Sequence, residues 1–145
     1  MIDEVQHVED WDLLAQFAQA YRGLSDALMD QIALHRSQAM LLCKLYVQDG
    51  MTQSEIAQQL SVQGATVTDM LQRMEDSGLV SRRRDQDDNR LVRVYLSDTG
   101  REKERSIMEQ FLKLEGAVFE GFNESDRAML RQYLNRALTN MSRFR

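Results

Sequence analysis

Apolar residues recur every three or four positions along residues 10–33, which read DWDLLAQFAQAYRGLSDALMDQIA. This spacing places the apolar side chains on one face of a helix, so the segment is predicted to form an amphipathic helix. Residues 37–47 (SQAMLLCKLYV) predict a second, largely buried helix, which Asp49 and Gly50 end.

The next stretch predicts two helices joined by a tight connector at residues 61–63. Thr52 followed three residues later by Glu55 is a capping-box pattern that opens the shorter helix. The longer helix runs from about residue 64 to 76 and ends before Gly78, a left-handed C-cap. Its buried stripe is Val67, Met70, Leu71 and Met74. Short helix, turn and longer helix are typical of a helix-turn-helix.

A charged hairpin is predicted directly afterwards. Residues 79–84 favour a strand, residues 86–89 a polar turn, and residues 92–96 alternate apolar and polar side chains. A hairpin in this position is a wing. Ser97 is expected to cap a long helix through about residue 119, and Asn123 or Ser125 a last one. The predicted fold is therefore mainly α with a small β-hairpin.

The first and last helices carry apolar stripes far from this compact middle. The last stripe comprises Leu130, Tyr133, Leu134, Ala137, Leu138 and Met141. We expect these helices to pack against a second copy of the chain. The predicted organisation is a dimerisation helix in residues 1–35, a winged helix-turn-helix in residues 36–97 and further dimerisation helices in residues 98–145.

Composition limits the other possibilities. The 145 residues include no proline and one cysteine, Cys43, so an internal disulfide is excluded. With only two histidines, the chain has few of the ligands that a transition-metal site needs. No phosphate loop or nucleophile motif points to an enzyme or a cofactor. Cys43 is expected to be a buried structural thiol, with redox activity left open. Neither a signal peptide nor a membrane span is apparent, so the cytoplasm is expected.

The net charge of −5 is unusual for a nucleic-acid-binding protein, but the acidity is local. Residues 1–35 hold seven acidic side chains and one basic, whereas residues 36–145 hold 16 acidic and 17 basic. A basic surface elsewhere therefore remains possible.

The middle of the chain resembles the winged-helix core of MarR-type transcription regulators. The resemblance is carried by TQSEIAQQL, ATVTDMLQRMEDSGLVSR, the Asp88-x-Arg90 pattern in the wing and LSDTGRE, in this order. It implies a homodimer, joined by the terminal helices, that binds double-stranded DNA at a near-palindromic site. It also implies a small acidic or phenolic effector that loosens DNA binding, and steric repression as the common outcome.

In such a fold the longer helix enters the major groove, with its N-terminal half at the base edges. Asp69 departs from the basic residue often found at its position. It can accept from a cytosine amino group or neutralise Arg73, its i+4 neighbour, and the second interpretation is favoured. The positions left for the outside are Gly64, Ala65, Thr66, Thr68, Asp69, Gln72 and Arg73.

The wing is expected to place Arg90 in the minor groove, where negative potential is concentrated. Asp88 would hold its guanidinium through paired hydrogen bonds. Arg82, Arg83, Arg84 and Arg93 would meet phosphates. The competing interpretation is a self-compensating surface hairpin.

Two further questions stay open in the sequence. The effector pocket is expected between the dimerisation helices and the winged helix, with Tyr21, Leu24, Met40 and Phe111 as candidate lining residues. The alternative function is a winged-helix module that binds protein partners without specific DNA binding.

Overall fold

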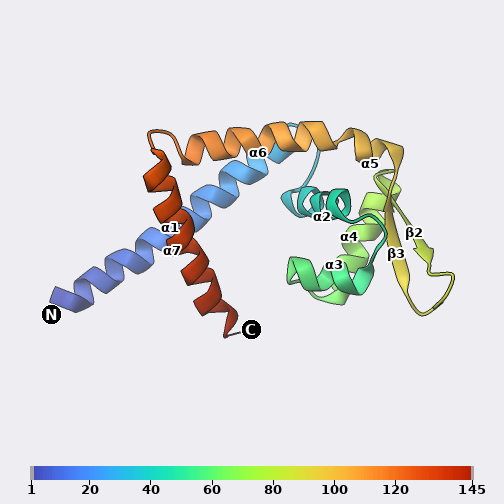
Figure 1. Cartoon of the computed structure of the whole chain (residues 1–145), viewed down its shortest axis with the longest axis horizontal. Helices are drawn as coiled ribbons and strands as arrows, with labels where there is room; N and C mark the ends of the chain where they lie inside the picture. The colour runs from blue at the N-terminus through green and yellow to red at the C-terminus, as the bar shows by residue number, and fades with distance from the viewer. Residues whose placement is uncertain (1, 145) are drawn as a thin grey trace. The chain divides into compact units, whose positions relative to one another are not determined.

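The computed structural model describes residues 2–144, with side chains from residue 9 onward. The chain is mostly helical and contains one small sheet (Figure 1). The elements are α1 (Ile2–Asp30), α2 (Arg36–Val47), β1 (Met51–Thr52), α3 (Gln53–Leu60), α4 (Gly64–Asp76), β2 (Val80–Arg84), β3 (Val92–Leu96), α5 (Asp98–Glu102), α6 (Glu104–Val118) and α7 (Glu124–Ser142). The chain divides into two units, Met1–Phe111 and Leu112–Arg145.

The core of the first unit lies where α2, α3 and α4 meet the sheet. Leu41, Ile56, Leu71 and Val94 are fully buried there. The end of α1 and the start of α6 join this core, through Met29 and Ile107 among others. Apolar residues on both sides of the predicted boundaries at residues 35/36 and 97/98 thus share one core with the winged helix.

Local hydrogen bonds form the predicted helix-turn-helix. The Thr52 hydroxyl accepts from the Glu55 amide at 3.1 Å, and Glu55 Oε2 accepts from the Thr52 amide at 3.0 Å, so the capping box is confirmed. Ser61 ends α3 in the left-handed region, with φ 55°. Gly78 follows α4 with φ +75°. The Leu79 amide then bonds back to the Met74 carbonyl, which closes a Schellman motif.

The sheet has three antiparallel strands in the order β1-β3-β2, one more than the sequence predicted. In the hairpin, Arg83 lies opposite Arg93 and Val80 opposite Leu96. The unpredicted strand β1 has two residues and pairs Met51 with Val94. Two residues are too short to show an alternating pattern, so only the pairing with β3 identifies this strand.

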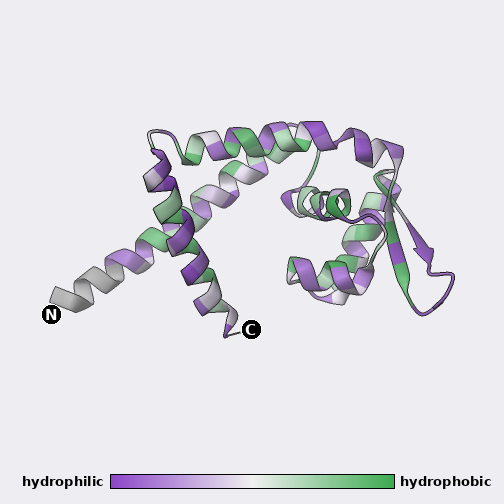
Figure 2. Cartoon of the chain, viewed as in Figure 1, coloured by the Kyte–Doolittle hydropathy of each residue, from purple (hydrophilic) through white to green (hydrophobic). Residues whose placement is uncertain are grey.

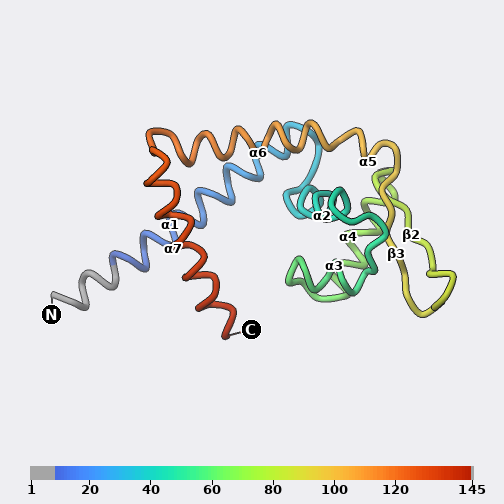
Figure 3. Tube along the Cα trace, viewed as in Figure 1, coloured from blue at the N-terminus to red at the C-terminus, as the bar shows by residue number. Residues whose placement is uncertain are grey.

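The path from α4 through the hairpin into α5 can be followed in the trace of Figure 3. Ser97 caps α5 as predicted, because its hydroxyl accepts from the Gly100 amide at 3.0 Å. The single long helix expected after Ser97 is wrong, since Lys103 separates α5 from α6. Its ψ of −17° tightens the backbone toward a 3₁₀ turn, and its ammonium donates to the Ile32 carbonyl at 3.0 Å.

Three helix ends differ from the sequence prediction or decide between its alternatives. α1 ends at Asp30 rather than residue 33, where Ala33 has a positive φ of 58°. The N-cap of α2 is His35, so this helix begins at Arg36, one residue before the predicted start. Asn123, not Ser125, caps α7, and its side chain accepts from the Asp126 amide at 2.8 Å.

The second unit contains the end of α6 and all of α7. None of the residues Glu124–Ser142 of α7 is buried. Green apolar and purple polar residues alternate along this helix (Figure 2). Arg127 ties its first turns to α6, with Nη1 donating to Glu115 Oε1 at 3.0 Å and the guanidinium 4.6 Å from the centre of the Phe119 ring.

Candidate nucleic-acid interface

The outward face of α4 is the first part of the candidate interface. Val67, Leu71 and Met74 are buried, and Met70 is partly buried against the same core, so the predicted stripe is confirmed. All seven positions assigned to the outside are exposed: Gly64, Ala65, Thr66, Thr68, Asp69, Gln72 and Arg73. The helix therefore presents its polar side to solvent along its whole length.

Both polar ends of the exposed Gln72 amide have hydrogen-bond partners in the chain. Its Nε2 donates to Asp76 Oδ1 at 3.0 Å, and its Oε1 accepts from Arg82 Nη2 at 2.6 Å. The Arg82 backbone amide and Nε both donate to Glu75 Oε2 at 3.1 Å. These bonds fasten the first strand of the wing to the end of α4, and the sequence analysis did not identify Glu75 as a partner.

Thr68, Ala65 and Thr66 complete the outward face near the start of α4. Thr68 donates to the Gly64 carbonyl at 3.0 Å and accepts from Gln53 Nε2 of α3 at 3.4 Å. Its methyl group stays exposed with the rest of the side chain. Ala65 and Thr66 lie one turn before Asp69 and Met70, in the N-terminal half of the helix.

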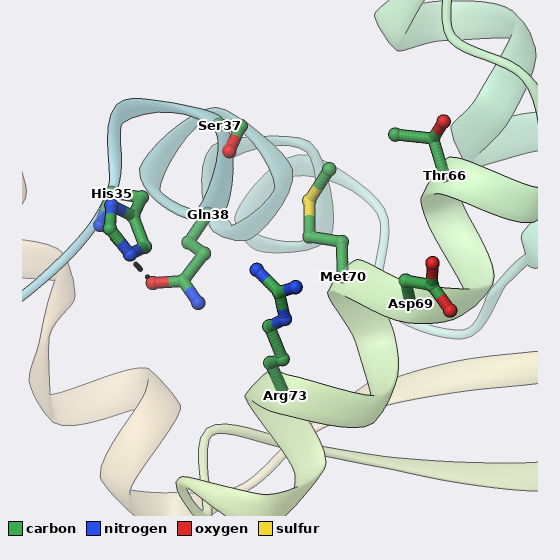
Figure 4. Close-up of a pocket in the computed structure, with 7 residues that line it drawn as sticks. All are labelled: His35, Ser37, Gln38, Thr66, Asp69, Met70 and Arg73. Carbon is green, nitrogen blue, oxygen red and sulfur yellow. Dashed lines mark hydrogen bonds between the residues drawn. The ribbon is translucent and has the colours of Figure 1, made fainter.

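The favoured pairing of Asp69 with Arg73 is not formed. The ion pairs among residues 9–144 include neither side chain. Figure 4 shows the Arg73 guanidinium directed toward Gln38 and Met70, and the Asp69 carboxylate directed away from it. Arg73 lines a groove between α2 and α4 on that side.

This groove between α2 and α4 has two parts. One part, of about 240 Å³, is lined by His35, Ser37, Gln38, Thr66, Asp69, Met70 and Arg73 (Figure 4). A neighbouring part of about 420 Å³ shares His35, Gln38 and Arg73. At its edge, Gln38 Oε1 accepts from the His35 amide at 3.2 Å.

The wing tip holds Arg90 in the geometry that the sequence suggested. Arg90 Nε donates to Asp88 Oδ1 and Arg90 Nη2 to Asp88 Oδ2, both at 3.0 Å. The Arg90 amide also donates to Asp88 Oδ1, at 3.1 Å. The bond from Arg90 lowers the pKa of Asp88 below its usual value. The Arg90 side chain nevertheless stays 86% exposed, so its guanidinium is fixed but accessible.

Arg83 and Arg93 face each other across the hairpin, which puts two cations on one face. Arg93 Nε donates to Asp85 Oδ2 and Nη1 to the Gly50 carbonyl at 2.9 Å. Arg83 instead lies over the Tyr95 ring, 4.2 Å from its centre. Sequence reasoning missed Asp85 and Tyr95, although two arginines directly opposite each other signal a need for compensation.

The predicted phosphate-binding arginines thus fall into two groups. Arg82 and Arg93 are bonded to carboxylates of the same module, with 18% and 33% of their side chains exposed. Arg83 and Arg84 are exposed. Arg84 Nη1 donates to the Asn89 carbonyl at 2.7 Å and so braces the tip loop.

The four candidate effector residues have different surroundings. Met40 lines a groove of about 300 Å³ with Arg36, Lys44 and Met70. Phe111 packs against the core, and Tyr21 stacks on Phe17 along α1 with ring centres 6.2 Å apart. Leu24 is exposed on the same helix.

Other chemistry has little support in the described residues. Cys43 is half-buried, and this burial raises the pKa of its thiol, which disfavours the reactive thiolate. Residues 9–144 contain no cluster of three or more potential metal ligands of the His, Cys, Asp and Glu types. None of the described helices has the length and apolar character needed to span a membrane.

The fold and the site together define a winged helix-turn-helix protein. The model of the MarR family matches residues 34–92. HTH-type transcriptional regulator YwoH of Bacillus subtilis is 30% identical over 118 residues, which cover 79% of this chain and 85% of that protein. Regulator YdgJ of the same organism is 31% identical over 109 residues, 75% of this chain. The chain therefore belongs to the MarR family.

The solved structures agree with this assignment. A complex of MepR from S. aureus with DNA matches with a TM-score of 0.81 and 25% identity, over 88% of this chain and 95% of that one. The matched segments span only 66% of YdgJ and 42% and 50% of two further curated regulators.

The Asp85–Arg93 ion pair makes the stability of the wing depend on pH. Hydrogen bonds from Arg93, and then from the Asp88 and Asp87 amides, lower the pKa of Asp85 to about 2. An unfolded aspartate titrates near 3.9. The stabilisation is therefore complete above about pH 4 and is lost as the pH falls toward 2. Asp85→Asn should lower the thermal midpoint at pH 7, with a deficit that shrinks between pH 4 and 2.

Thermal unfolding of both proteins followed by circular dichroism between pH 2 and 7 measures this difference. Asp87→Asn is the matched control, since the Asp87 carboxylate accepts no hydrogen bond from the described residues, and it should follow the wild type throughout. A constant deficit for Asp85→Asn across the whole range would contradict the ionic origin.

Proposed function

We propose that this protein is a sequence-specific, double-stranded DNA-binding transcriptional regulator that represses by occupying its operator. The observation that carries the proposal is the wing tip, where Asp88 fixes an 86% exposed Arg90 in the hairpin that follows a helix-turn-helix. A helix fits the major groove, and a cation fits an adjacent narrow minor groove. MepR, a structural neighbour, has been solved in complex with DNA.

Fixing Arg90 before binding reduces the conformational entropy that an arginine loses on contact. A free arginine would have to order its long side chain when it meets the groove. The bidentate bond to Asp88 holds the guanidinium plane and leaves its outer edge exposed. Arg83 and Arg84 are placed to approach phosphates, whereas Arg82 and Arg93 act by holding the hairpin against α4 and the turn at Gly50.

The supply of accessible cations limits the electrostatic part of binding. Residues 64–93 hold six basic and six acidic side chains, so the module does not attract polyanions in general. Affinity should rest on shape, base contacts and dimer geometry, with a shallow salt dependence for each protomer. Such a regulator would act in the cytoplasm.

Selection of bound fragments from a random duplex library, run for the wild type and Arg90→Ala, tests this proposal. The wild type should recover a two-fold symmetric motif. Arg90→Ala should bind it roughly 5- to 150-fold more weakly, with a salt slope reduced by about one per protomer. Arg105→Ala removes an equally exposed, ion-paired arginine from α6 and should bind like the wild type.

Failure of the wild type to recover any motif would contradict specific DNA binding. It would favour the alternative, a winged-helix module that binds protein partners, because such a module does not need a fixed arginine at the wing tip.

We also infer that the protein is a homodimer. α7 has no buried residue and exposes Tyr133, Leu134, Leu138 and Met141 on one side. α1 exposes Trp11, Leu14, Phe17 and Tyr21 in the same way. Soluble monomers rarely leave such apolar stripes in water, and packing against a second copy of the chain would cover them. Two copies would also supply the two recognition helices that a near-palindromic site needs.

Sedimentation equilibrium of the wild type and the double variant Leu134→Glu/Leu138→Glu tests the dimer. The wild type should sediment at twice the mass of one chain at micromolar concentration. The variant should dissociate, because it would bury two charges in an apolar contact. Gln132→Glu adds a charge to the opposite side of the same helix and should remain dimeric. A monomeric wild type would refute the dimer.

For the effector, we propose a small aromatic carboxylate bound in the groove between α2 and α4. Arg73 points into this groove without an ion-pair partner among residues 9–144, and the Gln38 amide and Met70 lie beside it. A guanidinium binds a carboxylate through two parallel hydrogen bonds, while Met70 and its neighbours offer apolar contact. Because Thr66 and Asp69 share the groove, a bound anion would lie against the DNA-facing helix and oppose the operator phosphates. A second candidate lining for the effector site remains the set Tyr21, Leu24, Met40 and Phe111.

Calorimetric titration of the DNA-free protein with benzoate as the probe tests the groove. The wild type should bind, and Arg73→Gln should bind at least ten-fold more weakly because the charge-assisted pair is lost. Arg105→Gln serves as the control for removal of one positive charge. Equal binding by Arg73→Gln and the wild type would exclude this groove as the carboxylate site, as would no binding by either.

A further inference from the structure

A carboxylate occupies the centre of the outward face of α4. Ala65, Asp69, Gln72 and Asp76 follow one another at intervals of four, three and four residues, so they form one stripe along the helix. This stripe lies opposite the buried residues Val67, Leu71 and Met74, and its members are exposed. The side chain that points most directly toward a bound groove is therefore acidic.

The other polar members of this stripe already have partners. Gln72 is bonded to Asp76 on one side and to Arg82 on the other. Ala65 has no polar atom in its side chain. Among the described residues of the stripe, Asp69 is thus the polar side chain whose oxygens remain without a partner in the chain.

The available cation does not neutralise Asp69. Arg73, one turn later, is directed toward Gln38 and Met70 of the groove beside α2 (Figure 4). An uncompensated carboxylate close to phosphates is unfavourable unless the DNA itself supplies a hydrogen-bond donor. That donor has to lie on the floor of the groove, where base edges are exposed, and not on its anionic walls.

We propose that Asp69 determines specificity by accepting a hydrogen bond from the exocyclic amine of a cytosine in the major groove. A carboxylate is an acceptor only. Guanine presents N7 and O6 and thymine presents O4, so each would repel it. Adenine offers its N6 amine, but the neighbouring N7 acceptor faces the second carboxylate oxygen. Cytosine alone offers the amine without an adjacent acceptor.

This inference rests on the proposed DNA binding and adds a defined feature to the operator. Asp69 is the sixth residue of α4. It therefore lies in the N-terminal half, which is the part of a recognition helix that meets base edges. Each half-site should therefore contain a cytosine at one fixed position. The two positions are related by the dyad of the operator, because each protomer contributes one Asp69.

Parallel selections from a random duplex library with the wild type, Asp69→Asn and Asp69→Ala test the proposal. The wild type should require cytosine at the symmetric position, and any other base should weaken binding roughly 5- to 150-fold per substituted pair. Asp69→Asn should change the preference to adenine, since an asparagine amide pairs with N6 and N7 together. Asp69→Ala should lose the preference at that position while the rest of the motif is kept.

Asp76→Asn is the matched control. It removes one negative charge from the same stripe of the same helix, and its carbonyl can still accept from Gln72. It should raise affinity for all sequences to a similar extent and leave the base preference at every position of the motif unchanged.

The possible failures are distinct. If the wild type recovers a symmetric motif and both Asp69 variants recover the same motif unchanged, Asp69 reads no base and this inference is overturned alone. If the wild type recovers no motif, the DNA-binding proposal fails first, and the role of Asp69 fails with it.

Discussion

The hairpin brings two arginines face to face, and the arrangement of the candidate interface depends on how their charges are compensated. Arg83 and Arg93 are direct cross-strand neighbours, a pairing that is destabilising by itself. The Asp85 carboxylate and the Gly50 carbonyl bind Arg93, while the Tyr95 ring supports Arg83. One arginine is thereby drawn into the base of the wing, and the other is left at its surface.

The neighbouring arginines also divide into some that are bonded within the module and some that stay exposed. Arg82 is bonded to Glu75 and Gln72, which joins the wing to α4. Arg90 is held by Asp88 but stays exposed. Three acidic residues thus orient three arginines: two fix the hairpin and one is presented at its tip. This explains how a module with balanced charge can still present cations where a nucleic acid would approach.

The junction after the wing is held by hydrogen bonds and by close backbone packing. The Asp49 carboxylate accepts from the Leu96 amide at 2.9 Å and pairs with Arg101 at 2.7 Å. The Tyr46 hydroxyl donates to the Gly100 carbonyl at 2.6 Å. A side chain at Gly100 would meet the Leu79 carbonyl oxygen at 2.2 Å, so only glycine lets α5 approach the hairpin this closely. The end of α2, the wing and α5 therefore form one connected support.

Much of this could be predicted from the sequence because its signals are local. The capping box at Thr52, the stripe of Val67, Leu71 and Met74 and the pair of Asp88 with Arg90 all involve residues within one or two turns of each other. In contrast, the sequence did not reveal contacts that join different elements. These are the pairing of strand β1, the bond between Arg82 and Gln72 and the ion pair of Asp85 with Arg93.

The i+4 rule also favoured pairing Asp69 with Arg73, but helix spacing permits that contact without requiring it. The Arg73 side chain is directed into the groove beside α2, and the residues that line this groove come from both α2 and α4. The sequence by itself thus determined which elements form and which residues face outward, since periodicity and caps are encoded over a few residues. The tertiary structure decided which of those outward residues remain without partners, since partners come from segments distant in the chain.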